Sequence, residues 1–173
     1  MFDLVLRQAC VDGHSRPVDL GIRDGTIAAM EPGLSHEGPQ EDLAGRYAFP
    51  GFVETHIHLD KACILERCPV REGTLDEAIS LTAQAKRAFT SEDVYARGQR
   101  VLDRAIVQGT TVLRSFVEVD PRAGMRAFEA VKVLKSDYAW AMDIEICAFA
   151  QEGLTQEMET YALLDREIGR AHV

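Results

Sequence analysis

The sequence after Pro50-Gly51 alternates between short apolar, β-branched segments and longer segments with helical periodicity. Strands are predicted over residues 52–59, 110–119 and 143–150, and helices from Thr74, from Ser91 to Gln108, and over residues 121–135 and 155–167. Such alternation favours a parallel sheet in which each helix crosses over between neighbouring strands. This region is therefore predicted to adopt an α/β fold.

The first 49 residues have a different pattern, in which short apolar runs are separated by turn-forming residues. Strands are predicted over residues 2–6, 17–23, 26–30 and 44–49, and a surface loop over residues 31–40. Asp24-Gly25 lies between the second and third of these strands, and this dipeptide is a strong signal for a tight hairpin. Residues 1–49 are thus predicted to form a separate β-region.

Charge and hydropathy argue against several classes of protein. A net charge of −9 and a pI near 5.0 argue against a nucleic-acid-binding surface, which needs clustered Lys and Arg. No apolar run approaches the roughly 20 residues that span a bilayer, and Met1-Phe2-Asp3 does not begin a signal peptide. We therefore expect a cytoplasmic protein without nucleic-acid or membrane partners, and four scattered cysteines that are reduced and structural.

The segment Phe52-Val53-Glu54-Thr55-His56-Ile57-His58-Leu59-Asp60 is the most informative motif. Side chains alternate faces along a strand, so Glu54, His56, His58 and Asp60 are predicted to share one side. Neutral imidazole is a favoured ligand of zinc and iron, and two histidines at this spacing can reach one ion. By itself, the pattern is more often that of two hydrogen-bonded or solvent-facing histidines on an ordinary strand.

The context of these histidines resembles the amidohydrolase superfamily. Pro50 to Asp60 is similar to the first barrel strand of that superfamily, and Gly109 to Ser115 and Asp143 to Gly153 are similar to its cytosine deaminase-like branch. The resemblance implies a TIM (β/α)₈ barrel beside a small β-sandwich built from both ends of the chain. Residues 1–49 would then belong to the sandwich and residues 50–167 to the N-terminal part of the barrel, about three strand-helix units.

The resemblance also assigns roles to individual residues. It implies that His56 and His58 are the first two ligands of one divalent metal ion, zinc or iron, and that Gln151 hydrogen-bonds a heterocyclic small-molecule substrate. Gln151 could equally be a loop amide that contacts backbone. The sequence departs from the branch at Phe116, where a histidine is expected, and at Glu118, which leaves the substrate open. Lys61 is interpreted as a surface lysine, and the spacing of the nearby cysteines 63 and 68 gives no support for a metal site.

The resemblance implies metal-assisted hydrolysis of a carbon–nitrogen bond, with deamination of an aminated heterocycle as the favoured reaction. The superfamily takes its remaining metal ligands and its general acid and base from later strands, and a complete barrel needs about 250 residues. We therefore expect this chain to be an inactive fragment without a catalytic residue of its own. Residues 168–173 are interpreted as a non-native tail, because Ile168-Gly169-Arg170-Ala171-His172-Val173 matches a translated sequencing adapter.

Two other functions stay open at this point. The barrel and metal are equally compatible with hydrolysis of an amide or a cyclic imide, and a short chain could instead be a non-catalytic interaction module. Self-association of the full-length protein is a further expectation from the family.

Overall fold

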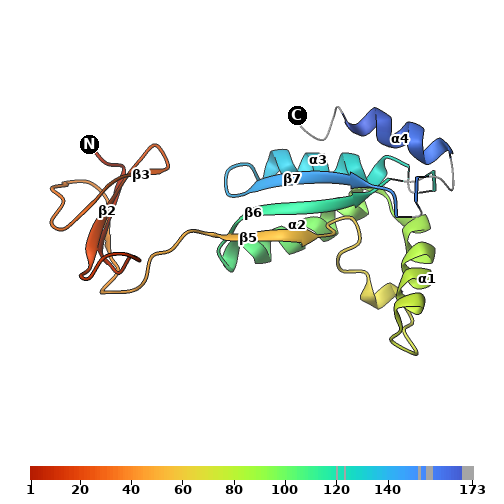
Figure 1. Cartoon of the computed structure of the whole chain (residues 1–173), viewed down its shortest axis with the longest axis horizontal. Coiled ribbons are helices and arrows are strands. Elements are labelled where there is room, and N and C mark those ends of the chain that lie inside the picture. Colours follow the sequence, from red (N-terminus) through yellow and green to blue (C-terminus); the bar gives the residue numbers. More distant parts are fainter. Residues whose placement is uncertain (120, 123, 152, 155–157, 169–173) are drawn as a thin grey trace. The chain divides into compact units, whose positions relative to one another are not determined.

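The computed structural model of the chain describes residues 1–119, 121–122, 124–151, 153–154 and 158–168 (Figure 1). The chain divides into two compact units, Met1–Pro50 and Gly51–Val173. Except for Ile168, the predicted tail lies outside the described residues. None of the described helices is long and apolar enough to cross a membrane.

The first unit is a four-stranded sheet with the strand order β3-β2-β1-β4. Its strands are β1 (Leu4–Ala9), β2 (Val18–Arg23), β3 (Thr26–Glu31) and β4 (Gln40–Asp42). The predicted hairpin between β2 and β3 is confirmed, because Asp24 and Gly25 both have positive φ, of 51° and 71°, as a tight two-residue turn requires. Ala9, Val18 and Leu20 form the small core of this unit.

Two predictions for the first unit are wrong. The first strand extends from Leu4 to Ala9 rather than over residues 2–6. Residues 44–49 form no strand, and only Tyr47 makes an isolated bridge, to Cys10. The reason is a turn at Ala44 and Gly45, whose positive φ values of 50° and 79° interrupt the extended backbone. The fourth strand lies earlier, at β4, and pairs with β1 in parallel.

The second unit has the predicted α/β fold. Its parallel sheet has the order β5-β6-β7, formed by Phe52–Ile57, Thr110–Glu118 and Asp143–Phe149. The helices are α1 (Leu75–Ala85), α2 (Ser91–Val107), α3 (Arg126–Asp137) and α4 (Met158–Ile168), with 3-10 turns η1 (Leu65–Arg67) and η2 (Lys86–Ala88). In Figure 1 the arrowheads of the three strands point towards the end of the sheet at which α1 lies.

Local capping explains where the helices begin. Thr74 caps α1 as predicted, since its Oγ1 accepts a hydrogen bond from the Glu77 amide at 3.2 Å. Helix α2 is capped by Thr90, one residue before the predicted start. Helix α3 begins at Arg126 and not at residue 121, because Gly124 has a positive φ of 59° that no right-handed helix contains.

The core of the second unit lies between the sheet and the packed helices α2 and α3. Side chains on a strand alternate between faces, and every second residue of β6 and β7 faces this core. The buried strand residues that face it are Leu113, Ser115, Val117, Ile144 and Ile146, and Glu118 at the end of β6 is buried as well. The alternate residues of β6, including Phe116, therefore lie on the opposite face of the sheet, where the predicted site residues gather.

Candidate metal and ligand site

The two motif histidines lie side by side at the carboxyl end of β5. Their ring centroids are 5.3 Å apart, with an angle of 65° between the ring planes. The strand is shorter than predicted and ends at Ile57, so only His56 belongs to it, and its pairing with β6 shifts in register between Glu54 and Ile57. The structure therefore brings the two imidazoles together through a strand end and a turn, and not through one regular strand.

The hydrogen bond of His58 determines which of its nitrogens can bind a ligand. Nδ1 lies 2.9 Å from the backbone carbonyl oxygen of Phe116. A carbonyl only accepts, so Nδ1 carries the hydrogen and donates it, which leaves the lone pair on Nε2. Burial, and then the nearby Lys61 ammonium, lowers the pKa of His58 below its ordinary value, so the ring is neutral at pH 7. Neutral imidazole with an anchored Nδ1 is the form that metal sites use.

Phe116 supports both histidines. Its ring stacks on the exposed ring of His56, with a centroid distance of 4.3 Å and an interplanar angle of 22°. Phe149 of β7 completes the ring cluster, since its centroid is 5.3 Å from that of His58. The residue at which the sequence departs from the cytosine deaminase-like pattern thus holds the imidazoles by its ring and by its backbone carbonyl.

Asp60 does not share a strand face with the histidines as predicted, because it lies in the turn beyond β5. Its side chain is only 2% exposed, and Oδ2 accepts a hydrogen bond from the Glu118 amide at 3.0 Å. Among the described residues Oδ1 has no hydrogen-bond partner, and it lies 3.9 Å from Nδ1 of His58. Burial raises the pKa of Asp60, against the opposing effects of the Glu118 amide and Lys61.

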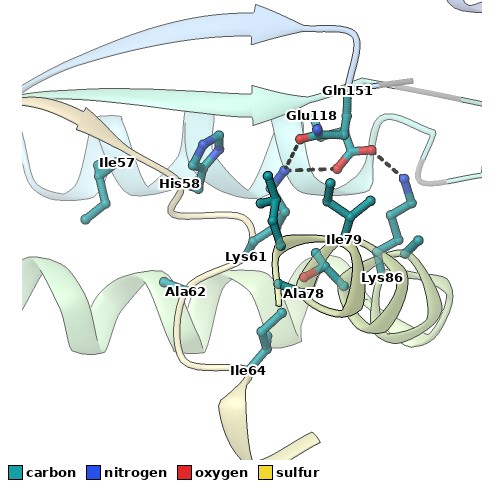
Figure 2. Close-up of a pocket in the computed structure, with 13 residues that line it drawn as sticks. Ile57, His58, Lys61, Ala62, Ile64, Ala78, Ile79, Lys86, Glu118 and Gln151 are labelled. Carbon is teal, nitrogen blue, oxygen red and sulfur yellow. Dashed lines mark hydrogen bonds and ion pairs between the residues drawn. The ribbon is translucent and has the colours of Figure 1, made fainter. Parts of the chain in front are cut away.

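The interpretation of Lys61 as a surface lysine is wrong. Its side chain is only 13% exposed, and Nζ donates to Glu118 Oε2 at 3.1 Å and to Gln151 Oε1 at 3.0 Å (Figure 2). The ammonium also lies 4.9 Å from the ring centroid of Phe149. Glu118 is buried and forms a second ion pair with Lys86 of η2. Lys61 thus joins the turn after β5 to the end of β6 and to the residue that follows β7.

These residues line one cavity of about 740 Å³. Its polar lining is formed by His58, Lys61, Lys86, Glu118 and Gln151, and residues of α1 line it as well (Figure 2). Because the amide oxygen of Gln151 accepts from Lys61, its NH₂ group is left as the donor. The arrangement can therefore offer hydrogen-bond donors to a polar ring beside an imidazole that is prepared to bind metal.

The remaining predicted features lie apart from the histidines. All four cysteines are free, and Cys63 and Cys68 line a neighbouring cavity of about 310 Å³. Within the described part of the chain, no group of three His, Cys, Asp or Glu residues could hold a metal ion. A metal ion bound by His56 and His58 would therefore need further ligands.

The sequence resembles known hydrolases although no family model matches it. It is 30% identical to the N-isopropylammelide isopropyl amidohydrolase of Pseudomonas sp. (strain ADP), over 96% of this chain and 43% of that protein. The structure superposes on the 5-methylcytosine deaminase of Klebsiella pneumoniae with a TM-score of 0.85 and 28% identity, covering 96% of this chain and 41% of that one.

A second solved structure gives a similar result. The N-isopropylammelide isopropylaminohydrolase of Burkholderia multivorans superposes with a TM-score of 0.83 and 29% identity, covering 98% of this chain and 43% of that one. The chain thus spans about two fifths of the length of these relatives. Its homologues and structural neighbours are hydrolases and deaminases of the amidohydrolase superfamily, and this chain corresponds to a fragment of them.

Proposed function

We propose that the full-length protein is a metal-dependent hydrolase that acts on carbon–nitrogen bonds and deaminates a small heterocycle. In this proposal β5, β6 and β7 are the first three strands of a (β/α)₈ barrel, and the sheet of residues 1–49 is part of a β-sandwich. The observation that carries the proposal is the neighbouring pair of imidazoles, in which His58 donates from Nδ1 to the Phe116 carbonyl and keeps Nε2 available.

His56 and His58 would hold one divalent zinc or iron ion together with ligands from outside the described residues. The chemistry supplied by such an ion is a water of lowered pKa. In the overall reaction, the water oxygen forms a bond to the ring carbon, the carbon–nitrogen bond breaks, and the amine leaves with a proton. The residues of this chain contribute by binding the ring and fixing its orientation.

Gln151 and Lys61 are the groups that would orient the ring. An ammonium has three donors, and within the described residues Lys61 uses two of them, on Glu118 and Gln151. The third donor and the amide NH₂ of Gln151 can both serve a ring carbonyl or ring nitrogen. Glu118 keeps Lys61 in position and compensates its charge in a partly buried place.

Hydrolysis of an amide or cyclic imide is the second candidate, and one comparison favours it. The chain is 38% identical to a D-hydantoinase of Rhizobium radiobacter over 127 residues, which cover 72% of this chain and 22% of that protein. Donors such as Lys61 and Gln151 suit an imide carbonyl as well as an aminated ring. Release of ammonia or amine from aminated pyrimidines and triazines, set against ring opening of hydantoins, separates the two reactions.

The test uses the full-length gene product, because the chain spans about two fifths of its relatives. We expect the purified protein to hold stoichiometric zinc or iron, and the double variant His56→Ala/His58→Ala to lose both the metal and amine release. His14→Ala, at an exposed histidine of the first unit, is the matched control and should retain both. Stoichiometric metal in the double variant, or none in the wild type, contradicts the proposal.

A further inference from the structure

We propose that Glu54 is a positioning residue for the two proposed metal ligands. Its carboxylate holds a bulge in β5 that turns both imidazoles onto the face of the sheet opposite to α2 and α3, the open face. The inference rests on the proposed function and extends it to a residue that does not itself bind the ion. Within the described residues no three His, Cys, Asp or Glu side chains could hold a metal, so Glu54 does not complete a ligand set with His56 and His58.

The pairing of β5 with β6 contains one extra residue on β5. Glu54 lies opposite Leu113, and Ile57 lies opposite Ser115. Three steps along β5, from residue 54 to 57, thus match two steps along β6, from residue 113 to 115. This is the pattern of a β-bulge, a feature that redirects side chains next to active sites. His56 lies within the bulge and has no partner residue on β6 in this register.

A regular ladder would place the imidazoles on the other face. Residues that pair across neighbouring strands have their side chains on the same face, and a shift by one residue moves a whole strand to the opposite face. Leu113 and Ser115 are both buried towards the core. A ladder that continued from Glu54 without a bulge would therefore set His56 opposite Ser115 and direct its ring towards the core.

The extra residue reverses this outcome. Ile57, instead of His56, lies opposite Ser115 and packs against the core. His56 stacks on Phe116, which lies on the open face. His58 follows Ile57 directly, and the two side chains leave the end of β5 on opposite sides (Figure 2). Both imidazoles therefore owe their place on the open face to the bulge.

The Glu54 carboxylate contacts the backbone of this bulge. Its Oε1 accepts a hydrogen bond from the His56 amide at 3.0 Å. An extra residue interrupts the ladder, so an amide within a bulge needs an acceptor of another kind. Arg114 of β6 donates to Glu145 at 2.7 Å, and within the described residues Glu54 forms no ion pair. The carboxylate thus serves the strand backbone and not a neighbouring cation.

The first experiment measures the zinc affinity of the full-length protein by competition with a chelator. Glu54→Ala removes the acceptor and should weaken zinc binding by about 10-fold or more, as expected for a residue that orients a metal ligand. Glu54→Gln keeps a side-chain oxygen that can accept, and its affinity should stay within about threefold of wild type. Glu41→Ala, at an exposed glutamate of β4, is the matched control and should leave the affinity unchanged.

Hydrogen exchange of the metal-free full-length protein tests the bulge independently of the metal. The His56 amide should exchange about 10-fold faster in Glu54→Ala than in wild type, because it loses its acceptor. Glu54→Gln should restore most of this protection. The amide of Ile146 in β7 should keep its wild-type rate in both variants, which separates a local effect from general unfolding.

Either an unchanged zinc affinity or an unchanged exchange rate of the His56 amide in Glu54→Ala would overturn the inference. Equal losses in Glu54→Ala and Glu54→Gln would also overturn it, because the negative charge and not the acceptor would then matter. Faster exchange of the Ile146 amide would assign Glu54 to the stability of the whole fold, with the same consequence. A wild-type protein that binds no zinc or iron contradicts the proposed function instead, and the exchange rates still show whether Glu54 holds the bulge.

Discussion

Arg97 of α2 anchors the turn that carries His58 and Lys61, so its replacement should loosen the site. Its buried guanidinium donates through Nη1 to the backbone carbonyls of Asp60 at 2.9 Å and Ala62 at 2.6 Å. It also lies 4.4 Å over the ring of Phe89, which adds a cation–π contact. Methionine at this position keeps an apolar stem of similar length and removes the donors.

The cost of Arg97→Met follows from these contacts. A hydrogen bond to a charged group contributes about 1.5–3 kcal/mol. Arg97→Met removes the two bonds to the turn, and it also removes the bond from Nε to Asp93 at 3.1 Å, which lies within α2. Removal of the buried charge recovers part of this sum as desolvation. We expect the turn to lose about 2–4 kcal/mol of local stability. Arg97→Lys, whose ammonium lacks the planar fork and reaches one carbonyl, should lose about half as much.

Hydrogen exchange measures this local stability directly. The Lys61 amide donates to the His58 carbonyl at 3.2 Å and reports on opening of the turn. In the full-length gene product, a loss of about 2–4 kcal/mol accelerates its exchange by about 30- to 900-fold. Arg100→Met, at an exposed arginine of the same helix, should leave the rate unchanged. Exchange in Arg97→Met within about threefold of wild type would show that Arg97 does not anchor the turn.

Two further predictions concern the pH dependence of the first unit and the aromatic support of the site. Burial acts to raise the pKa of Asp19, but hydrogen bonds from Arg7 and from two backbone amides lower this pKa overall. The ionised carboxylate therefore stabilises the folded state fully at pH values above the ordinary pKa of Asp. This contribution is lost as the pH falls through the lowered pKa of the folded state. Asp19→Asn should abolish this acid-dependent step in a circular dichroism titration and cost about 1–3 kcal/mol at pH 7, and an unchanged acid profile would contradict the assignment. Phe116→Leu removes the ring that stacks on His56 but keeps the backbone carbonyl that accepts from His58. The zinc affinity of the full-length protein, measured by competition with a chelator, should therefore fall by about 2- to 10-fold. A loss above about 100-fold would mean that the fold has changed.

Secondary structure was predictable where local chemistry decides it. The Asp24-Gly25 hairpin and the Thr74 cap depend on residues within three positions of each other, and both occur as predicted. The strand predicted over residues 44–49 failed because a non-glycine residue, Ala44, adopts positive φ. The local signals for this turn were Asp42, whose carboxylate accepts a hydrogen bond from the Ala44 amide at 2.8 Å, and Gly45, which also has positive φ. The turn leaves Asp42 and the preceding residues beside β1 instead.

The candidate site was predictable only in part, because its missing members meet through sheet register. The alternation of side chains along a strand predicts that His56 and His58 lie close together, and their rings are neighbours in the structure. Lys61 and Glu118 are 57 residues apart, and they meet because β5 and β6 pair in parallel with Ile57 opposite Ser115. Sequence spacing carries no information on that register, so Lys61 had the pattern of an ordinary surface lysine. The polar residue Glu118 at the end of an apolar strand was the one available signal.

The hydrogen bonds around His58 imply that its half of the site is formed before any metal binds. β6 holds the turn by three hydrogen bonds. The Phe116 carbonyl accepts from His58, and the Ser115 hydroxyl accepts from the Leu59 amide at 3.2 Å. The Glu118 amide donates to the Asp60 carboxylate. Arg97 holds it from the helix side. None of these contacts involves a metal ligand outside the described residues, so a metal would bind a ring whose tautomer and position are already determined. Apparent metal affinity should therefore follow mutations in these anchors as well as mutations in the ligands themselves, because each anchor lost adds an ordering cost to binding.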